Sequence, residues 1–77
     1  YYLFKRGAAF AGGMMQLPAD APARPHWLPY VAVASADASA ARAAELGATV
    51  LVPPTDIQDW GRFAVAMDPT GATFGIL

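Results

Sequence analysis

Two apolar runs separated by a glycine open the chain. Tyr1 to Arg6 is rich in aromatic residues, which favour β-strands, and Gly7 follows as a turn residue. Ala8 to Met15 has the composition of a returning strand, so the pattern predicts a β-hairpin. The pair Gly12-Gly13 inside the second run predicts a bulge, or a place where another group approaches the backbone closely.

A proline-rich segment separates this hairpin from a second region of regular structure. Leu17 to Pro29 contains four prolines and is predicted to be extended. Leu28 to Ser35 is predicted as a strand. Asp37 is then predicted as the N-cap of a helix that ends at Leu46, with Gly47 as the first residue beyond it. Helical spacing places four residues on the face expected to meet a sheet: Ala40, Ala43, Ala44 and Leu46.

Three further strands are predicted after the helix. Thr49 to Val52 forms the first, and Pro53-Pro54 ends it or places it at a sheet edge. Arg62 to Asp68 forms the second, Asp68 to Gly71 forms a turn, and Ala72 to Leu77 forms the last strand. Alternation assigns the residues of the second strand to two faces: Phe63, Val65 and Met67 on one, and Arg62, Ala64, Ala66 and Asp68 on the other.

The element order predicts a single α+β domain with one main helix. Residues 1–17 form the hairpin, residues 18–26 form the proline-rich linker, and residues 27–77 form a strand–helix–strand–strand–strand (βαβββ) module. A chain of 77 residues with 56% hydrophobic composition has little interior in which to bury its apolar surface. Part of that surface is therefore expected to meet a partner, and a lone hairpin is only marginally stable. We expect a homodimer.

Charge and cysteine content narrow the possible classes of function. The chain has five basic and six acidic residues, and Lys5-Arg6 is its one basic cluster, so no binding of nucleic acid or anionic membrane is expected. The chain has no cysteine, which excludes a thiolate metal site within it. Apolar runs are too short to span a membrane, and Tyr1 does not open a pattern typical of signal peptides. A cytoplasmic protein is expected.

The second region resembles a known superfamily. The run "GATVLVPPTDI" after the helix and the ending "GRFAVAMDPTGATFGIL" resemble the vicinal oxygen chelate superfamily, which includes glyoxalases, extradiol dioxygenases and bleomycin-resistance proteins. With "HWLPYVAV", they resemble its hydroxylase-associated, antigen-type glyoxalase-like branch. The resemblance covers residues 27–77 as one module. It implies a curved mixed sheet, and it implies that residues 1–17 are similar to the last two strands of a preceding module.

The resemblance also identifies two positions where metal-dependent members carry ligands. Those enzymes have a histidine on the first strand of a module and a glutamate on the last, and two modules together complete the coordination. The corresponding positions here are near Tyr30 and at Gly75. A neutral phenol and a glycine are not usual ligands of divalent ions. His26, the one histidine of the chain, lies in the linker without a carboxylate at ligand spacing. We therefore expect no metal and no other cofactor.

Aromatic and small residues form the candidate binding site. By analogy with the concave sheet of the superfamily, Tyr30, Thr73 and Gly75 are predicted to line a cavity, with large aromatic side chains around it. The candidate ligand-binding residues are Trp27, Tyr30, Trp60, Phe63, Thr73 and Gly75. The competing interpretation is that these aromatic residues are simply core or subunit interface.

Three hypotheses of function follow. The first is a metal-free module that binds a small apolar or aromatic molecule of unknown identity in a cavity formed by paired modules. The second is a metal-dependent lyase or dioxygenase whose ligands lie in another module. The third is a structural half-domain whose faces are all interface. Gly75 disfavours the second, and the apolar composition supports the first and third alike.

Overall fold

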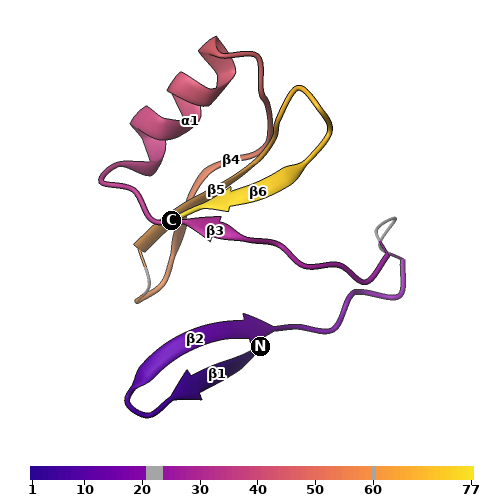
Figure 1. The fold of residues 1–77 in the computed structure, drawn as a ribbon, viewed down its shortest axis with the longest axis vertical. Coiled ribbons are helices and arrows are strands. Elements are labelled where there is room, and N and C mark those ends of the chain that lie inside the picture. The colour runs from indigo at the N-terminus through magenta and orange to yellow at the C-terminus, as the bar shows by residue number, and fades with distance from the viewer. Residues whose placement is uncertain (21–23, 60) are drawn as a thin grey trace.

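A two-stranded hairpin opens the structure, a computed structural model that describes residues 1–20, 24–59 and 61–77. Strands β1 (Tyr2–Arg6) and β2 (Ala9–Met14) pair in antiparallel register (Figure 1). The register shifts between Phe4 and Lys5, which leaves Ala11 as an extra residue, one position before the predicted bulge. The Tyr1 ring lies over Gly13, so the predicted close approach to the backbone of Gly12-Gly13 is confirmed.

The remaining strands form one four-stranded mixed sheet. β3 (Tyr30–Val31), β4 (Thr49–Ile57), β5 (Gly61–Met67) and β6 (Thr73–Ile76) are arranged in the order β3-β6-β5-β4. β3 pairs with β6 in parallel, and the other pairs are antiparallel. The predicted α+β fold, a hairpin followed by a βαβββ module, is confirmed.

Two strands differ from the prediction. β4 does not stop at Pro53-Pro54 but continues to Ile57, with register shifts between Val50 and Val52 and between Val52 and Thr55. The prolines are tolerated because β4 is an edge strand, whose outer side needs no N–H donors. β3 is shorter than the predicted strand from Leu28 to Ser35, since the chain soon leaves the sheet to begin the helix.

Helix α1 (Ala36–Glu45) connects β3 to β4, and its N-cap is Ser35 rather than the predicted Asp37. Ser35 has extended backbone angles, and its Oγ accepts a hydrogen bond from the Ala38 N–H at 3.2 Å. Asp37 in the first turn instead receives two hydrogen bonds from Arg62 of β5, at 2.8 and 3.2 Å. Gly47 follows the helix with φ of 99°, as predicted. No helix in the described ranges is long and apolar enough to cross a membrane.

The core lies between α1 and the sheet and consists of small side chains. Ala36 and Ala40 of the helix pack on Ala64 and Ile76, with Val33 and Phe74 beside them. Ala64 and Ala66 are fully buried, which confirms the predicted faces of β5. Two residues predicted on the buried face are corrections: Ala44 is exposed, and Leu46 is 65% exposed because it is the C-cap, where the chain turns away from the sheet.

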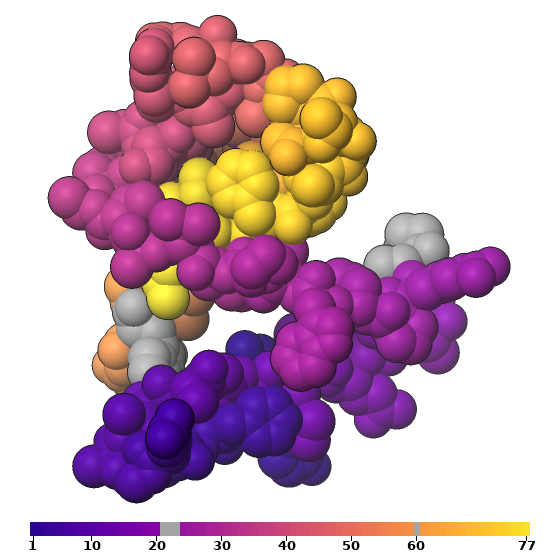
Figure 2. Space-filling model, viewed as in Figure 1, coloured from indigo at the N-terminus to yellow at the C-terminus, as the bar shows by residue number. Residues whose placement is uncertain are grey.

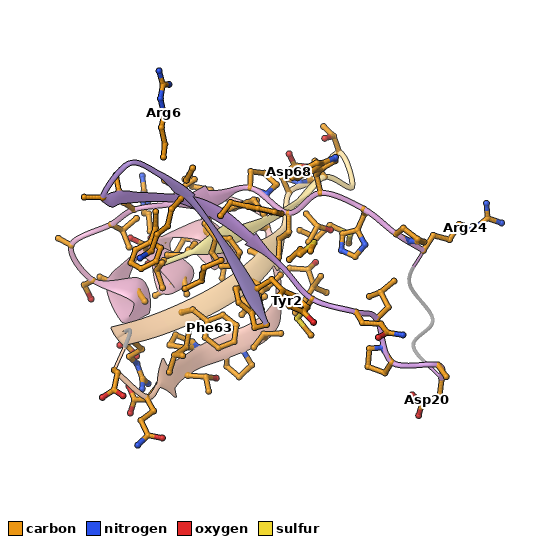
Figure 3. The ribbon with its side chains drawn as sticks, turned by 90° about the horizontal axis from the view of Figure 1, so that it is seen from below. Tyr2, Arg6, Asp20, Arg24, Phe63 and Asp68 are labelled. Atoms are coloured by element: carbon orange, nitrogen blue, oxygen red, sulfur yellow. The ribbon has the colours of Figure 1, made fainter. Side chains whose placement is uncertain are left out.

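The hairpin stands apart from this core. Figures 1 and 3 show it on the side of the four-stranded sheet opposite to α1, and Figure 2 shows the linker atoms between hairpin and module. The radius of gyration is 13.4 Å. A compact chain of this length would have about 11.5 Å. Every residue of β1 is exposed, so the hairpin obtains no cover from α1 or from the four-stranded sheet.

Candidate ligand-binding site

One face of the four-stranded sheet is left uncovered by the helix. Register pairs Tyr30 with Gly75, Gly75 with Val65, and Met67 with Thr73, so these side chains share a face. Phe63 lies on the same face by alternation along β5. We call this surface the open sheet face and define it by six residues: Tyr30, Phe63, Val65, Met67, Thr73 and Gly75. Within this set, Gly75 is buried, and the other residues from β5 and β6 are half-buried: Phe63, Val65, Met67 and Thr73.

The Tyr30 ring lies directly on Gly75. A Cβ atom at position 75 would be 2.3 Å from Cδ2 and Cε2 of Tyr30 and 2.8 Å from its Cγ. The Gly75 N–H also donates to the Pro29 carbonyl at 2.7 Å, which holds β6 against the beginning of β3. Because the clash would involve one edge of the ring and extend to Cγ, position 75 has no room for a side chain while Tyr30 keeps this orientation.

Electrostatics keep the Tyr30 phenol in its neutral form. Partial burial raises the pKa of Tyr30 above its ordinary value, and the nearby Tyr1 raises that pKa further. Within the described residues the Tyr30 hydroxyl has no protein hydrogen-bond partner. It is therefore a neutral donor that a bound molecule can use.

The residues of the open sheet face do not fit a divalent metal ion. Gly75 offers no side-chain ligand, and the space beside it is filled by the Tyr30 ring. A phenol whose pKa is raised is a poor ligand, because metal binding requires the phenolate. Elsewhere in the described ranges, no three side chains of the His, Cys, Asp and Glu types lie close enough together to hold an ion.

The structure brings four of the six predicted site residues onto one face. Tyr30, Phe63, Thr73 and Gly75 all belong to the open sheet face. Trp27 does not: it lies in the linker and is 90% exposed. Trp60 lies outside the described residues.

A second hollow lies between the hairpin, the linker and β3, and we call it the linker cavity. Its volume is about 660 Å³. The hairpin and the residues just after it contribute Tyr1, Phe4, Gly13, Met14, Met15, Gln16 and Leu17, while the second part of the chain contributes Pro25, His26, Trp27, Leu28 and Tyr30. Sequence reasoning missed Tyr1, Met14 and Met15 as candidates, because only the path of the linker brings them to Trp27.

Comparison with known proteins adds an independent line of evidence. The sequence profile of the Glyoxalase-like domain family matches residues 3–77. The chain is 49% identical over 78 aligned positions to proteins named "Putative glyoxylase CFP32" from Mycobacterium bovis and Mycobacterium tuberculosis. It is 40% identical over 65 positions, 84% of the chain, to "Anthracycline biosynthesis protein DnrV" from Streptomyces peucetius.

These relatives are considerably longer than the chain. The match covers all of this chain but 29% of the mycobacterial proteins, and it covers 23% of the Streptomyces protein. The family assignment is based on the match of the domain profile to residues 3–77, a range that includes both the hairpin and the module. The chain belongs to the glyoxalase-like domain family of the vicinal oxygen chelate superfamily.

Proposed function

We propose that this chain is a small-molecule-binding part of a glyoxalase-like protein and that it works without a divalent metal or another cofactor. The observation that carries the proposal is the Tyr30 ring on Gly75. It fills, with an uncharged aromatic group, the position where the metal-dependent members of the superfamily have a carboxylate. The site is then suited to contact a molecule by shape and dispersion rather than to polarise it.

The rest of the open sheet face supports an apolar or aromatic ligand. Phe63, Val65 and Met67 offer a half-buried apolar surface, and Thr73 supplies one hydroxyl beside it. Few polar groups on a largely apolar surface are typical of sites that orient a small molecule. The names of the relatives concern small-molecule chemistry, glyoxylase in one case and anthracycline biosynthesis in the other, which is consistent with such a role.

A single module provides one wall of a cavity, so the proposal includes a partner. We infer that two copies pair as a two-fold dimer, in which Leu3 and Phe10 of the hairpin, together with the open sheet face, are covered. Leu3 and Phe10, which do not line the linker cavity, are each at least 44% exposed in the isolated chain. Light scattering at micromolar concentration tests this point. A dimer is expected, and a folded, monodisperse monomer would contradict the pairing.

Metal content tests the central claim. Elemental analysis after exhaustive dialysis is expected to find far less than one Zn, Fe, Ni or Mn ion per chain. The glyoxylase name of the relatives favours a second candidate, a metal-dependent lyase or dioxygenase whose ligands lie in another module. One tightly held ion per chain, lost together with activity on chelation, would support that candidate and overturn the metal-free proposal.

A further inference from the structure

We propose that the linker cavity, and not only the open sheet face, binds a ligand, and that this ligand is a neutral, planar aromatic molecule. The inference rests on the proposed function in taking the chain as a small-molecule binder, but it places the ligand between the hairpin and the linker. Tyr30 is the residue common to the two surfaces, since it covers Gly75 and also lines the cavity.

Size and lining both match a molecule of a few fused rings. The cavity of about 660 Å³ lies within the range of roughly 300–1,000 Å³ that small-molecule sites occupy. Its wall contains four aromatic side chains, Tyr1, Phe4, Trp27 and Tyr30, together with the flexible thioethers of Met14 and Met15. Aromatic faces stack on planar rings, and methionine adapts to their edges.

Charge argues for a neutral occupant. None of the side chains that line the cavity is that of Asp, Glu, Lys or Arg, so no permanently charged side chain in its wall would compensate a buried ionic group. The pKa of Tyr30 is raised, mainly by burial, which indicates that this position already disfavours a charge on the protein side. A charged ligand would lose hydration there without gaining a permanently charged side chain as a partner.

Two glycines shape the aromatic wall. A Cβ atom on Gly13 would lie 2.4 Å from the Tyr1 ring, just as one on Gly75 would strike the Tyr30 ring. The absence of these side chains lets both rings lie close to the backbone of the neighbouring strand. Tyr1 and Tyr30 both line the cavity, and the pKa of Tyr30 is raised by burial and then by Tyr1, so their hydroxyls are available there as neutral donors.

The tautomer of His26 adds an acceptor. Its Nδ1 lies 2.6 Å from the Arg24 carbonyl, which can only accept, so Nδ1 carries the hydrogen in this contact. In the neutral ring Nε2 is then free of a proton and can accept a hydrogen bond from a ligand hydroxyl. A planar phenol or hydroxylated polycyclic compound would match an aromatic wall that bears both donors and an acceptor.

Methionine methyl resonances provide a direct test, because the three methionines separate the two surfaces. Met14 and Met15 line the linker cavity, and Met67 lies on the open sheet face. We expect titration of the chain, carrying ¹³C-labelled methionine methyls, with 1-naphthol to shift the signals of Met14 and Met15 and to leave Met67 unchanged. A shift of Met67 alone would overturn the cavity assignment while leaving the proposed function intact.

Two comparison compounds and two variants sharpen the test. Decahydro-1-naphthol, which is not planar, and 1-naphthalenesulfonate, which is charged, should each bind more weakly than 1-naphthol. Trp27→Ala should weaken 1-naphthol binding by about tenfold. Tyr2→Ala changes an exposed aromatic residue that does not line the cavity, so it should leave the affinity for 1-naphthol unchanged.

Three results would overturn the proposal. The first is the absence of a shift at Met14 and Met15 up to millimolar 1-naphthol. The second is equal binding of 1-naphthalenesulfonate and 1-naphthol. The third is an equal loss of affinity in Trp27→Ala and Tyr2→Ala.

Discussion

The hairpins β1–β2 and β5–β6 have the same local design and very different surroundings. After the turn, one reads Gly7-Ala8-Ala9-Phe10 and the other Gly71-Ala72-Thr73-Phe74, and both glycines have positive φ, 62° and 94°. Glycine adopts this conformation without steric cost, so in both hairpins the chain can reverse at the same place. The pairing of the two strands is therefore encoded locally in each case.

The two hairpins differ in how far other elements of the fold bury them. In β5–β6, Ala64, Ala66 and Ile76 lie under α1, and β3 and β4 flank the pair on both sides. In β1–β2 every residue except the half-buried Gly13 is exposed. An isolated two-stranded hairpin is at best marginally stable, whereas a hairpin inside a covered sheet shares the stability of the domain. The same turn motif therefore occurs once within a covered sheet and once in an exposed hairpin.

The turns themselves also differ. In the β5–β6 turn the Asp68 carboxylate accepts hydrogen bonds from the Thr70 N–H at 2.9 Å, the Thr70 hydroxyl at 2.7 Å and the Ala72 N–H at 2.9 Å. The β1–β2 turn follows Arg6 and has no such carboxylate before its glycine. The buried hairpin thus has a reinforced turn, and the exposed hairpin relies on backbone pairing and on contacts such as Lys5 over the Phe10 ring at 5.1 Å.

The largest difference in melting temperature is expected between two variants that each carry a new carboxylate, one in the buried hairpin and one in the exposed hairpin. Ala64 is fully buried beneath α1, so Ala64→Asp should unfold the module, because an unpaired buried carboxylate costs on the order of several kcal/mol. Ala11→Asp, on the exposed hairpin, should change the melting temperature little. Circular dichroism melts measure both. Similar melting temperatures for the two variants would show that the two hairpins are equally covered in solution.

The two tyrosine–glycine contacts should respond differently to an added methyl group. Gly75→Ala should destabilise the module by about 1–3 kcal/mol, because the new Cβ strikes the Tyr30 ring. Gly13→Ala should be nearly neutral, since Tyr1 is 78% exposed and its ring can move aside. Urea denaturation measures both. In a Tyr30→Ala background Gly75→Ala should become neutral or stabilising, and persistence of the full loss there would refute the clash.

Low pH should destabilise the β5–β6 turn, because this turn depends on the ionised Asp68 carboxylate. Hydrogen bonding, chiefly from the Thr70 hydroxyl and next from the Ala72 N–H, lowers the pKa of Asp68. The stability from this group is therefore present above the unfolded-state pKa of about 4 and is lost as pH falls through the lower folded-state value. Asp68→Asn should melt below the wild type at neutral pH and converge with it in acid. A constant difference between the two proteins down to pH 2 would exclude this role of Asp68.

The smallest effect is expected at alkaline pH. It concerns Tyr30, which belongs to the open sheet face and also lines the linker cavity. The pKa of Tyr30 is raised by burial and then by Tyr1, so its stabilising contribution is complete below about pH 10 and falls as pH rises through the folded-state value. The difference between phenolate absorbance titrations of the wild type and Tyr30→Phe isolates this group. A midpoint at or below the ordinary tyrosine value would contradict the contact between Tyr30 and its surroundings.

Local rules predicted the elements whose partners are near in sequence. The Asp68–Gly71 turn has the expected backbone bond from the Gly71 N–H to the Asp68 carbonyl at 3.0 Å, and Gly47 ends the helix region with positive φ. Alternation along β5 correctly separated Phe63 from Ala64. These features depend on the backbone preferences of a few adjacent residues, which the sequence states directly.

Prediction was wrong or incomplete where residues distant in sequence were involved. Ser35 and Asp37 are both good N-cap residues; in the structure Ser35 is the cap, and the Asp37 carboxylate instead pairs with Arg62, which lies 25 positions away. Pro53-Pro54 was predicted either to end the strand or to mark a sheet edge; the edge alternative is correct, and the strand continues to Ile57. Neither outcome can be read from a window of neighbouring residues.

The sequence by itself determined the secondary-structure order, the family resemblance, and the glycine at position 75 in place of a carboxylate. Only the tertiary structure decided that the Tyr30 ring occupies the space this glycine leaves, and that Tyr1 and Trp27 face the same cavity across the linker. The reason is physical: turns and caps depend on contacts within a few residues, whereas a cavity depends on where a long proline-containing segment places two distant surfaces.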